Sequence, residues 1–141
     1  GVRQQLERIS IYPKLCGIRH KLENEQDDRF MLREDFVRGV GVLTEFDLPF
    51  DLLLRSKHLR LAAELASRLP EQRFVLNHIG KPPIKTGQMS PWDRDLRCLA
   101  ACPNVFCKIS GMVGEADWKN GSLLIFAPIL TSFLRLSAPS G

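Results

Sequence analysis

Residues 74–83 read Phe-Val-Leu-Asn-His-Ile-Gly-Lys-Pro-Pro. The stretch begins with three apolar residues. Pro70 precedes them, and a loop rich in glycine and proline follows. This pattern predicts a short buried β-strand over 74–77. Asn77 and His78 stand at its end, so side chains capable of chemistry directly follow a buried element.

Four such units follow one another along the chain. We predict strands at four short apolar runs, over 15–18, 50–54, 74–77 and 105–109. The charged segment 21–33 shows little periodicity and is expected to be a loop. Apolar spacing and proline boundaries predict helices over 2–9, 34–46, 56–69 and 91–101. Alternating helices and strands predict an α/β fold with a parallel sheet.

Polar side chains gather where the predicted strands end: Arg19 and His20, Arg55, Asn77 and His78, and Lys108 and Ser110. In a (β/α) barrel, the carboxyl ends of the strands carry the active site. The pattern therefore predicts a functional site at one edge of the sheet. His58 lies in the first turn of a predicted helix, away from that edge, and we expect it to face solvent.

The composition is that of an ordinary globular chain of about one domain. The chain has 141 residues, of which 44% are hydrophobic and 26% charged, and a net charge of +4. Its basic residues are scattered, which argues against a nucleic-acid partner. The apolar run over 123–134 is shorter than the roughly 20 residues that a membrane-spanning helix needs, so no membrane partner is expected.

Four cysteines, at positions 16, 98, 102 and 107, lack the paired spacing of a zinc site. We interpret them as small buried hydrophobic residues in a reducing, cytoplasmic compartment. The chain begins with Gly1 and shows no signal-peptide pattern, and we expect it to be a piece of a longer protein. Motifs of serine hydrolases and of phosphate-binding loops do not occur in the sequence.

Several segments, in order along the chain, carry a resemblance to a known family. They are 17–20 (GIRH), 49–53 (PFDLL), 74–83 (FVLNHIGKPP), 103–113 (PNVFCKISGMV) and 115–118 (EADW). Together they resemble the amidohydrolase-related lactonases, a family of TIM barrels that hydrolyse L-fuconolactone, L-rhamnonolactone or 2-pyrone-4,6-dicarboxylate lactone. The resemblance covers residues 1–119 and implies a partial (β/α)8 barrel, with about strands three to six. Residues 120–141 depart from it and are interpreted as a divergent apolar tail.

The resemblance also implies roles for individual side chains. His78 would face the substrate carbonyl, either polarising it directly or holding a divalent metal such as zinc. The expected substrate-binding residues are Arg19, His20, Arg55, Lys81 and Trp118. Because only Arg19 and Arg55 are well placed for carboxylates, a sugar lactone is favoured over an aromatic dicarboxylate as the small-molecule substrate.

Two functions remain open at this point. The first is a hydrolase that opens a lactone ring with water, of which this chain is the central portion. The alternative is a catalytically inactive truncated isoform or an interaction module. The family's His-x-His segment of the first strand and its aspartate of the eighth strand do not occur here, so we expect the isolated chain to be inactive.

Overall fold

The computed structural model describes residues 1–117, 119 and 127. Trp118 and the predicted apolar tail over 120–141, apart from Ala127, lie outside the described residues. The family-like segment predicted over 1–119 is therefore almost fully described, and the boundary proposed after it stays a prediction.

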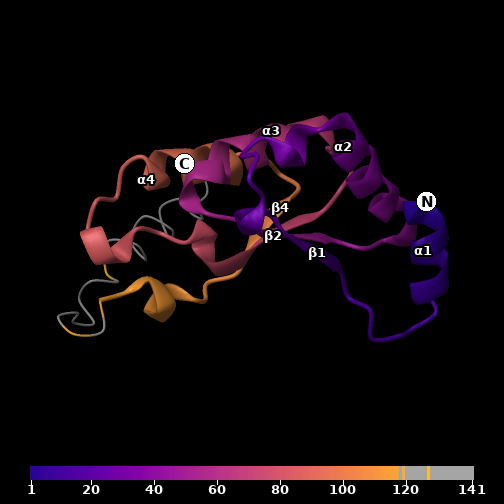
Figure 1. The fold of residues 1–141 in the computed structure, drawn as a ribbon, viewed down its shortest axis with the longest axis horizontal. Coiled ribbons are helices and arrows are strands. Elements are labelled where there is room, and N and C mark those ends of the chain that lie inside the picture. The colour runs from indigo at the N-terminus through magenta and orange to yellow at the C-terminus, as the bar shows by residue number, and fades with distance from the viewer. Residues whose placement is uncertain (118, 120–126, 128–141) are drawn as a thin grey trace, which may run out of the picture.

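Four short strands form one parallel sheet in the order of the chain: β1 (Ile18–Lys21), β2 (Phe50–Leu53), β3 (Phe74–Leu76) and β4 (Val105–Cys107). All three pairings are parallel, and each of β1 to β3 is followed by a segment with helices or helical turns that returns to the next strand (Figure 1). The prediction of an α/β fold with a parallel sheet is confirmed. The arrangement is that of a partial (β/α) barrel.

Strand β1 lies three residues later than the predicted 15–18. Ile18 pairs with Phe50 at the start of both strands, and its N–H donates to the Pro49 carbonyl at 3.0 Å. The strand then runs through the polar pair Arg19 and His20, with alternate residues more and less exposed. The prediction was wrong because it ended the strand where the apolar run ended, whereas a strand needs apolar residues on one face only.

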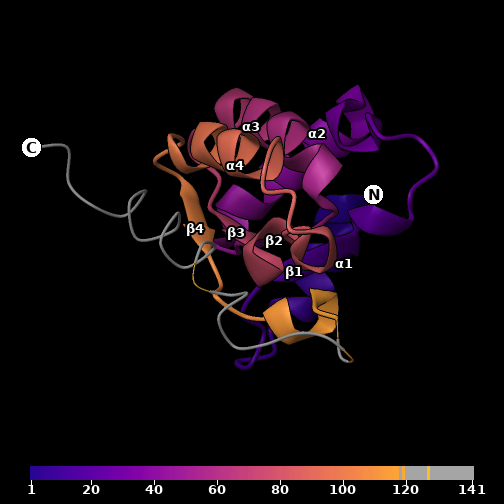
Figure 2. The same cartoon turned by 90° about the vertical axis from the view of Figure 1, so that its left-hand side faces the viewer.

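Helices cover one face of the sheet. They are α2 (Glu34–Gly41), α3 (Leu59–Arg68) and α4 (Trp92–Ala100), and Figure 2 shows them together on one side of the strands. A 3-10 turn, η3 (Val42–Phe46), continues α2, and α1 (Val2–Ile9) contacts that turn. The segment 21–33, predicted as a loop, holds two short 3-10 turns, η1 (Leu22–Asn24) and η2 (Phe30–Leu32).

The core lies between the sheet and these helices. Alternate residues of β2 and β3, namely Phe50, Leu52, Phe74 and Leu76, are buried in it. Leu65 of α3 and Leu99 of α4 are each fully buried against the same cluster. Burying a leucine side chain contributes about 1.5–3 kcal/mol, so these contacts fix the strands beneath the helices.

The opposite face of the sheet is open among the described residues, and we call it the inner face. Arg19, Asp51, Val75 and Phe106 lie side by side on it in strand register. Phe106 is 57% exposed. The 3-10 turn after β4, η7 (Met112–Glu115), lies on this side, away from α2 to α4 (Figure 2).

The cysteines correct a second expectation. Cys16 and Cys98 are exposed, whereas Cys102 and Cys107 are half-buried, and all four are free thiols. Cys98 lies on α4 between the buried positions Leu96 and Leu99, off the face that packs on the core. No helix among the described residues is long and apolar enough to cross a bilayer.

Candidate active site at the carboxyl ends of the strands

A left-handed turn follows β3 and carries His78. It lies within a 3-10 segment, η5 (Asn77–Gly80), in which His78 and Ile79 depart from helical geometry with φ values of 55° and 50°. Gly80 and Lys81 follow with φ values of 65° and 52°. Non-glycine residues in this region cost about 1–2 kcal/mol each. Such strain persists only where the surroundings hold it, and it clusters at functional sites.

The His78 imidazole is held by the segment that follows β4. Its Nδ1 lies 3.0 Å from the Ser110 hydroxyl. Gly111 lies so close that a Cβ added there would stand 2.4 Å from the same ring nitrogen. The half-buried ring therefore has a fixed place, with Ser110 bound to Nδ1.

A polar network spans three strands on the inner face. The Asp51 carboxylate of β2 accepts a hydrogen bond from the Asn77 amide at 3.3 Å and forms an ion pair with the Lys108 ammonium at 2.8 Å. Arg19 of β1 lies beside Asp51 in register. Two cations, Arg19 and Lys108, therefore lie on the same face as the Asp51 carboxylate. A guanidinium such as that of Arg19 can bind a carboxylate or sugar hydroxyls.

This face is hollowed. A groove of about 450 Å³ is lined by Arg19, Asp51, Val75 and Lys108, and it extends toward the amino ends of β1 and β2, where Cys16, Gly17 and Pro49 line it. His78 does not line this groove. The volume of the groove falls within the range of small-molecule pockets. The sequence-predicted Arg19 thus borders a groove of suitable size.

Lys81, the last residue of the left-handed turn, is held by a carboxylate. Its ammonium forms an ion pair with Glu23 of η1, and both side chains are largely shielded from solvent. The ion pair ties the loop after β1 to the loop after β3 at the same edge of the sheet. Part of the charge predicted for substrate binding is therefore balanced within the protein.

His20 is separated from the other predicted site residues. Its ring stacks on Phe30 at a centroid distance of 5.4 Å and lies edge-on to Phe36. Its Nε2 lies 2.6 Å from a Glu25 carboxylate oxygen. Because His20 alternates with Arg19 along β1, it points to the helix-covered side while Arg19 lies on the inner face.

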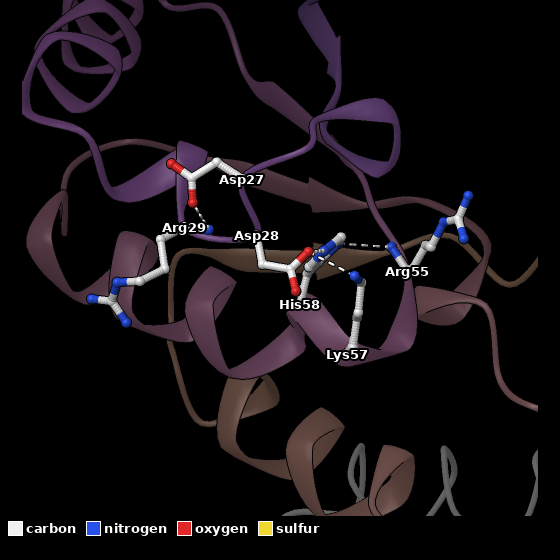
Figure 3. A network of polar contacts seen from close by, with 6 residues as sticks. All are labelled: Asp27, Asp28, Arg29, Arg55, Lys57 and His58. Carbon is white, nitrogen blue, oxygen red and sulfur yellow. Dashed lines mark hydrogen bonds and ion pairs between the residues drawn. The ribbon is translucent and has the colours of Figure 1, made fainter.

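The expectation that His58 faces solvent is wrong. The side chain is buried in η4 (Ser56–His58), the turn that joins β2 to α3. Its Nδ1 accepts the Arg55 backbone N–H at 3.3 Å, and its Nε2 lies 3.1 Å from an Asp28 carboxylate oxygen (Figure 3). The first turn of a helix faces solvent only when no other segment covers it. Here the segment that carries Asp28 covers His58.

The exposed Arg55 side chain extends away from this network (Figure 3). The Asp28 carboxylate also accepts a hydrogen bond from the Lys57 ammonium at 2.6 Å. Hydrogen bonds from Lys57 and His58 lower the pKa of Asp28 below its ordinary value. The network therefore fixes the backbone of Arg55 through its N–H group.

Sequence reasoning missed the role of Asp51 and of its partner Asn77 in the polar network. One signal was available, since Asp51 is an acid within an otherwise apolar strand and alternates with Phe50 and Leu52. An acid at such a position must lie on the face opposite the core. Its partner Lys108, 57 residues away, could not be identified without the strand order.

The donors that would hold a metal do not assemble within the described residues. No group of three or more His, Cys, Asp or Glu side chains there could hold a metal ion. His78 is a single imidazole beside a hydroxyl, whereas zinc sites use three or four protein ligands. The residues present do not, by themselves, fit a zinc site.

Comparison with known proteins places these features in a family. The family model described as amidohydrolase matches residues 1–140. An L-fucono-1,5-lactonase from Burkholderia multivorans is 38% identical over 126 residues, which cover 84% of this chain and 43% of that protein. An L-fucono-1,5-lactonase from Burkholderia ambifaria is also 38% identical, over 74% of this chain and 36% of that protein.

Solved structures agree with the sequence comparisons. A crystal structure of an amidohydrolase from Burkholderia multivorans with bound zinc superimposes with a TM-score of 0.82 at 34% identity, over 97% of this chain and 51% of that one. The chain thus spans about half the length of the relatives it matches or less. A match over residues 1–140, a parallel β/α sheet and this structural similarity show that the chain belongs to the amidohydrolase family.

Proposed function

We propose that this chain provides the carbonyl-polarising and substrate-binding part of a lactone hydrolase. The observation that carries the proposal is the His78 imidazole, held in a left-handed turn at the carboxyl edge of a parallel sheet. The proposed substrate is a sugar lactone of the L-fuconolactone or L-rhamnonolactone type, supported by two relatives named as L-fucono-1,5-lactonases.

In the proposed reaction, a water oxygen attacks the ring carbonyl carbon and the ester C–O bond of the ring breaks. The attacking water loses a proton, the departing ring oxygen takes up a proton to become a hydroxyl, and the product is an open-chain hydroxy acid. His78 would donate a hydrogen bond to the carbonyl oxygen as negative charge develops on it. We assign no general base among the described residues, because the Asp51 carboxylate is already bound by Asn77 and Lys108.

Three cationic side chains form the proposed binding set. Arg19 borders the groove, Arg55 extends from a fixed backbone, and Lys81 is the last residue of the turn that carries His78. Trp118 remains a proposed substrate contact and lies outside the described residues. We leave His20 out of the set because its ring is stacked on the other side of β1.

A divalent metal such as zinc is present in one structural relative. In this chain, His78 is the residue we propose as a ligand for any such metal. A metal bound there would polarise the carbonyl as a Lewis acid. Because the described residues do not supply the other ligands, we assign no step of the reaction to a metal.

The proposed setting is the cytoplasm, which free thiols favour. The proposed ligand is a small molecule, and neither a nucleic acid nor a membrane is proposed as a partner. Residues 1–119 are proposed as the central part of the barrel and 120–141 as a separate tail.

A second candidate is a catalytically inactive form or an interaction module. It is favoured by the share of the lactonase relatives that the chain spans, which is 43% and 36%. The open inner face points in the same direction, because Phe106 is exposed there.

Hydrolysis of L-fucono-1,5-lactone and L-rhamnonolactone by the 141-residue chain separates the two, measured by acid release with and without added zinc. If the chain is active, His78→Ala should lower turnover by about a hundredfold or more. Glu71→Ala, an exposed side chain at the amino ends of the strands, is the control. Turnover that survives His78→Ala would contradict the assigned role. Turnover that His78→Ala abolishes would contradict the second candidate, whereas a folded chain without turnover is the result we expect of an incomplete barrel.

A further inference from the structure

The left-handed turn at His78 is held by two hydrogen bonds, one to the backbone N–H and one to the backbone carbonyl of Ile79. The Ile79 N–H donates to the Lys108 carbonyl at 3.2 Å, which ties the turn to the end of β4. The Ile79 carbonyl accepts the indole N–H of Trp92 at 3.0 Å. Ile79 therefore has both backbone groups bound, although it lies in a region that a β-branched residue rarely adopts.

Trp92 is suited to hold this carbonyl. It is 1% exposed at the first position of α4, and Ile79 is fully buried, so water does not compete for the hydrogen bond. The donor comes from a helix that packs on the core, which makes it a rigid anchor. A buried carbonyl without a donor would favour any backbone rearrangement that reaches a new partner.

The position of the imidazole depends on this turn. His78 immediately precedes Ile79, and the His78 carbonyl accepts the Lys81 N–H at 2.9 Å across the turn. A change of φ at either residue would swing the His78 ring away from the Ser110 hydroxyl, 3.0 Å from Nδ1. Lys108, Ser110 and Trp92 therefore act on one short segment.

We propose that Trp92 is a positioning residue for His78. The Trp92 indole N–H holds the Ile79 carbonyl, and this hydrogen bond keeps residues 78–81 in the turn that brings the His78 imidazole to Ser110. Its value for catalysis rests on the proposed function, whereas the positioning itself does not. The alternative is that Trp92 only fills space in the core. The two differ in whether the N–H group, rather than the ring, is needed.

The test is the ¹⁵N spectrum of histidine-labelled 141-residue chain, with His78 assigned by its loss in His78→Gln. Ser110→Ala gives the signals of a His78 ring without the hydroxyl contact. Trp92→Phe removes the N–H and keeps an aromatic ring. Gln72→Met is the matched control, since Gln72 is also buried and donates to the Leu48 and Arg73 carbonyls at the amino ends of the strands.

We expect the His78 signals of Trp92→Phe to move to those of Ser110→Ala, while Gln72→Met keeps the original signals. Unchanged His78 signals in a folded Trp92→Phe chain would overturn the proposal, and so would an equal change in Gln72→Met. If Trp92→Phe does not fold, benzothienylalanine at position 92 decides, because sulfur replaces the N–H while the shape is kept. Its His78 signals must then move in the same way.

A second measurement keeps this proposal apart from the proposed function. If the chain hydrolyses the lactone, Trp92→Phe should lower kcat by up to about a hundredfold and change KM little, because a displaced imidazole affects the transition state. An equal loss through KM alone would contradict the positioning role. If the unmodified chain has no activity, as we expect of the isolated chain, kcat gives no readout, and the ¹⁵N spectra alone decide the role of Trp92.

Discussion

The His78 imidazole lies where it does because residue 111 has no side chain. Gly111 has a φ of 72°, and a Cβ there would stand 2.4 Å from His78 Nδ1 and 2.8 Å from its Cβ. Both the backbone conformation and the close approach require glycine. The candidate site thus depends on a close contact between the His78 ring and the backbone of Gly111.

Gly111→Ala should therefore displace the His78 ring and destabilise the chain by about 1–2 kcal/mol or more from backbone strain alone. Urea unfolding measures the loss of stability, and the His78 imidazole signals report the displacement. Gly114→Ala is the control, because nothing lies within 4 Å of a Cβ at that position. Equal effects of the two substitutions would contradict the close contact.

Cys107 provides a chemical prediction at the same scale. Burial raises the pKa of its thiol from 9.0 to about 11. Because the thiolate is the nucleophile, about one Cys107 thiol in a thousand is ionised at pH 8. Iodoacetamide at pH 8 should therefore label Cys107 far more slowly than the exposed Cys16 and Cys98. Peptide mass spectrometry measures the rates, and comparable labelling of Cys107 would refute the burial.

At the scale of elements, His58 joins two loops that follow neighbouring strands. It belongs to η4, after β2, and its partner Asp28 lies in the segment after β1 (Figure 3). Since the Arg55 backbone N–H donates to His58 Nδ1, the neutral ring carries its proton on Nε2 and donates it to Asp28. One buried imidazole thus sets the path of both loops at the site edge.

His58→Ala should cost about 1–3 kcal/mol of unfolding free energy, because the Arg55 N–H loses its acceptor and a buried ring is removed. Equilibrium urea unfolding at pH 7 measures it. Lys57→Ala, at the adjacent exposed position, should change stability by less than about 1 kcal/mol. A similar small effect for His58→Ala would show that the loops hold together without the imidazole.

The same junction predicts a pH dependence. Hydrogen bonds from Lys57 and His58 lower the pKa of Asp28 from 3.8 in the folded chain. As the pH falls, the Asp28 carboxylate is therefore protonated in the unfolded chain before it is protonated in the folded chain. The contribution of Asp28 to stability is fully present above pH 3.8 and is lost as the pH falls through the lower folded-state value.

Asp28→Asn should consequently lower stability at pH 6 and make less difference at pH 3, measured by urea unfolding at both values. Glu71→Gln, on an exposed position away from the junction, controls for general charge effects. If the difference between Asp28→Asn and the unmodified chain stayed constant across this range, the ion pair would not be contributing.

At the scale of the whole molecule, the sequence predicted the sheet better than the site. Strands β2 to β4 could be located because proline, glycine and polar residues mark the ends of their short apolar runs. Strand β1 was misplaced because His20 faces the helix-covered side, where its ring contacts Phe30 and Phe36. Those contacts depend on how segment 21–33 and α2 fold back over β1.

The site was predictable only where it follows from strand ends. His78 could be predicted at the site edge because parallel strands bring their carboxyl ends to one edge. Arg19, also predicted at a strand end, is instead the second residue of β1. The partners of Asp51, His58 and Lys81 lie 57, 30 and 58 residues away in sequence. Pairings at such separations are set by the topology of the sheet, which local periodicity does not report.

Ligand binding at His78 is best measured by a titration of the ¹⁵N-histidine-labelled chain with L-fuconate, the stable hydroxy acid that L-fuconolactone hydrolysis would release. The chain holds three histidines, all of them described. A binding site at the carboxyl edge of the sheet predicts saturable shifts of the His78 signals, while buried His58 and stacked His20 stay unchanged. Unmoved His78 signals, or shifts of His20 in their place, would contradict a binding site at the carboxyl edge of the sheet.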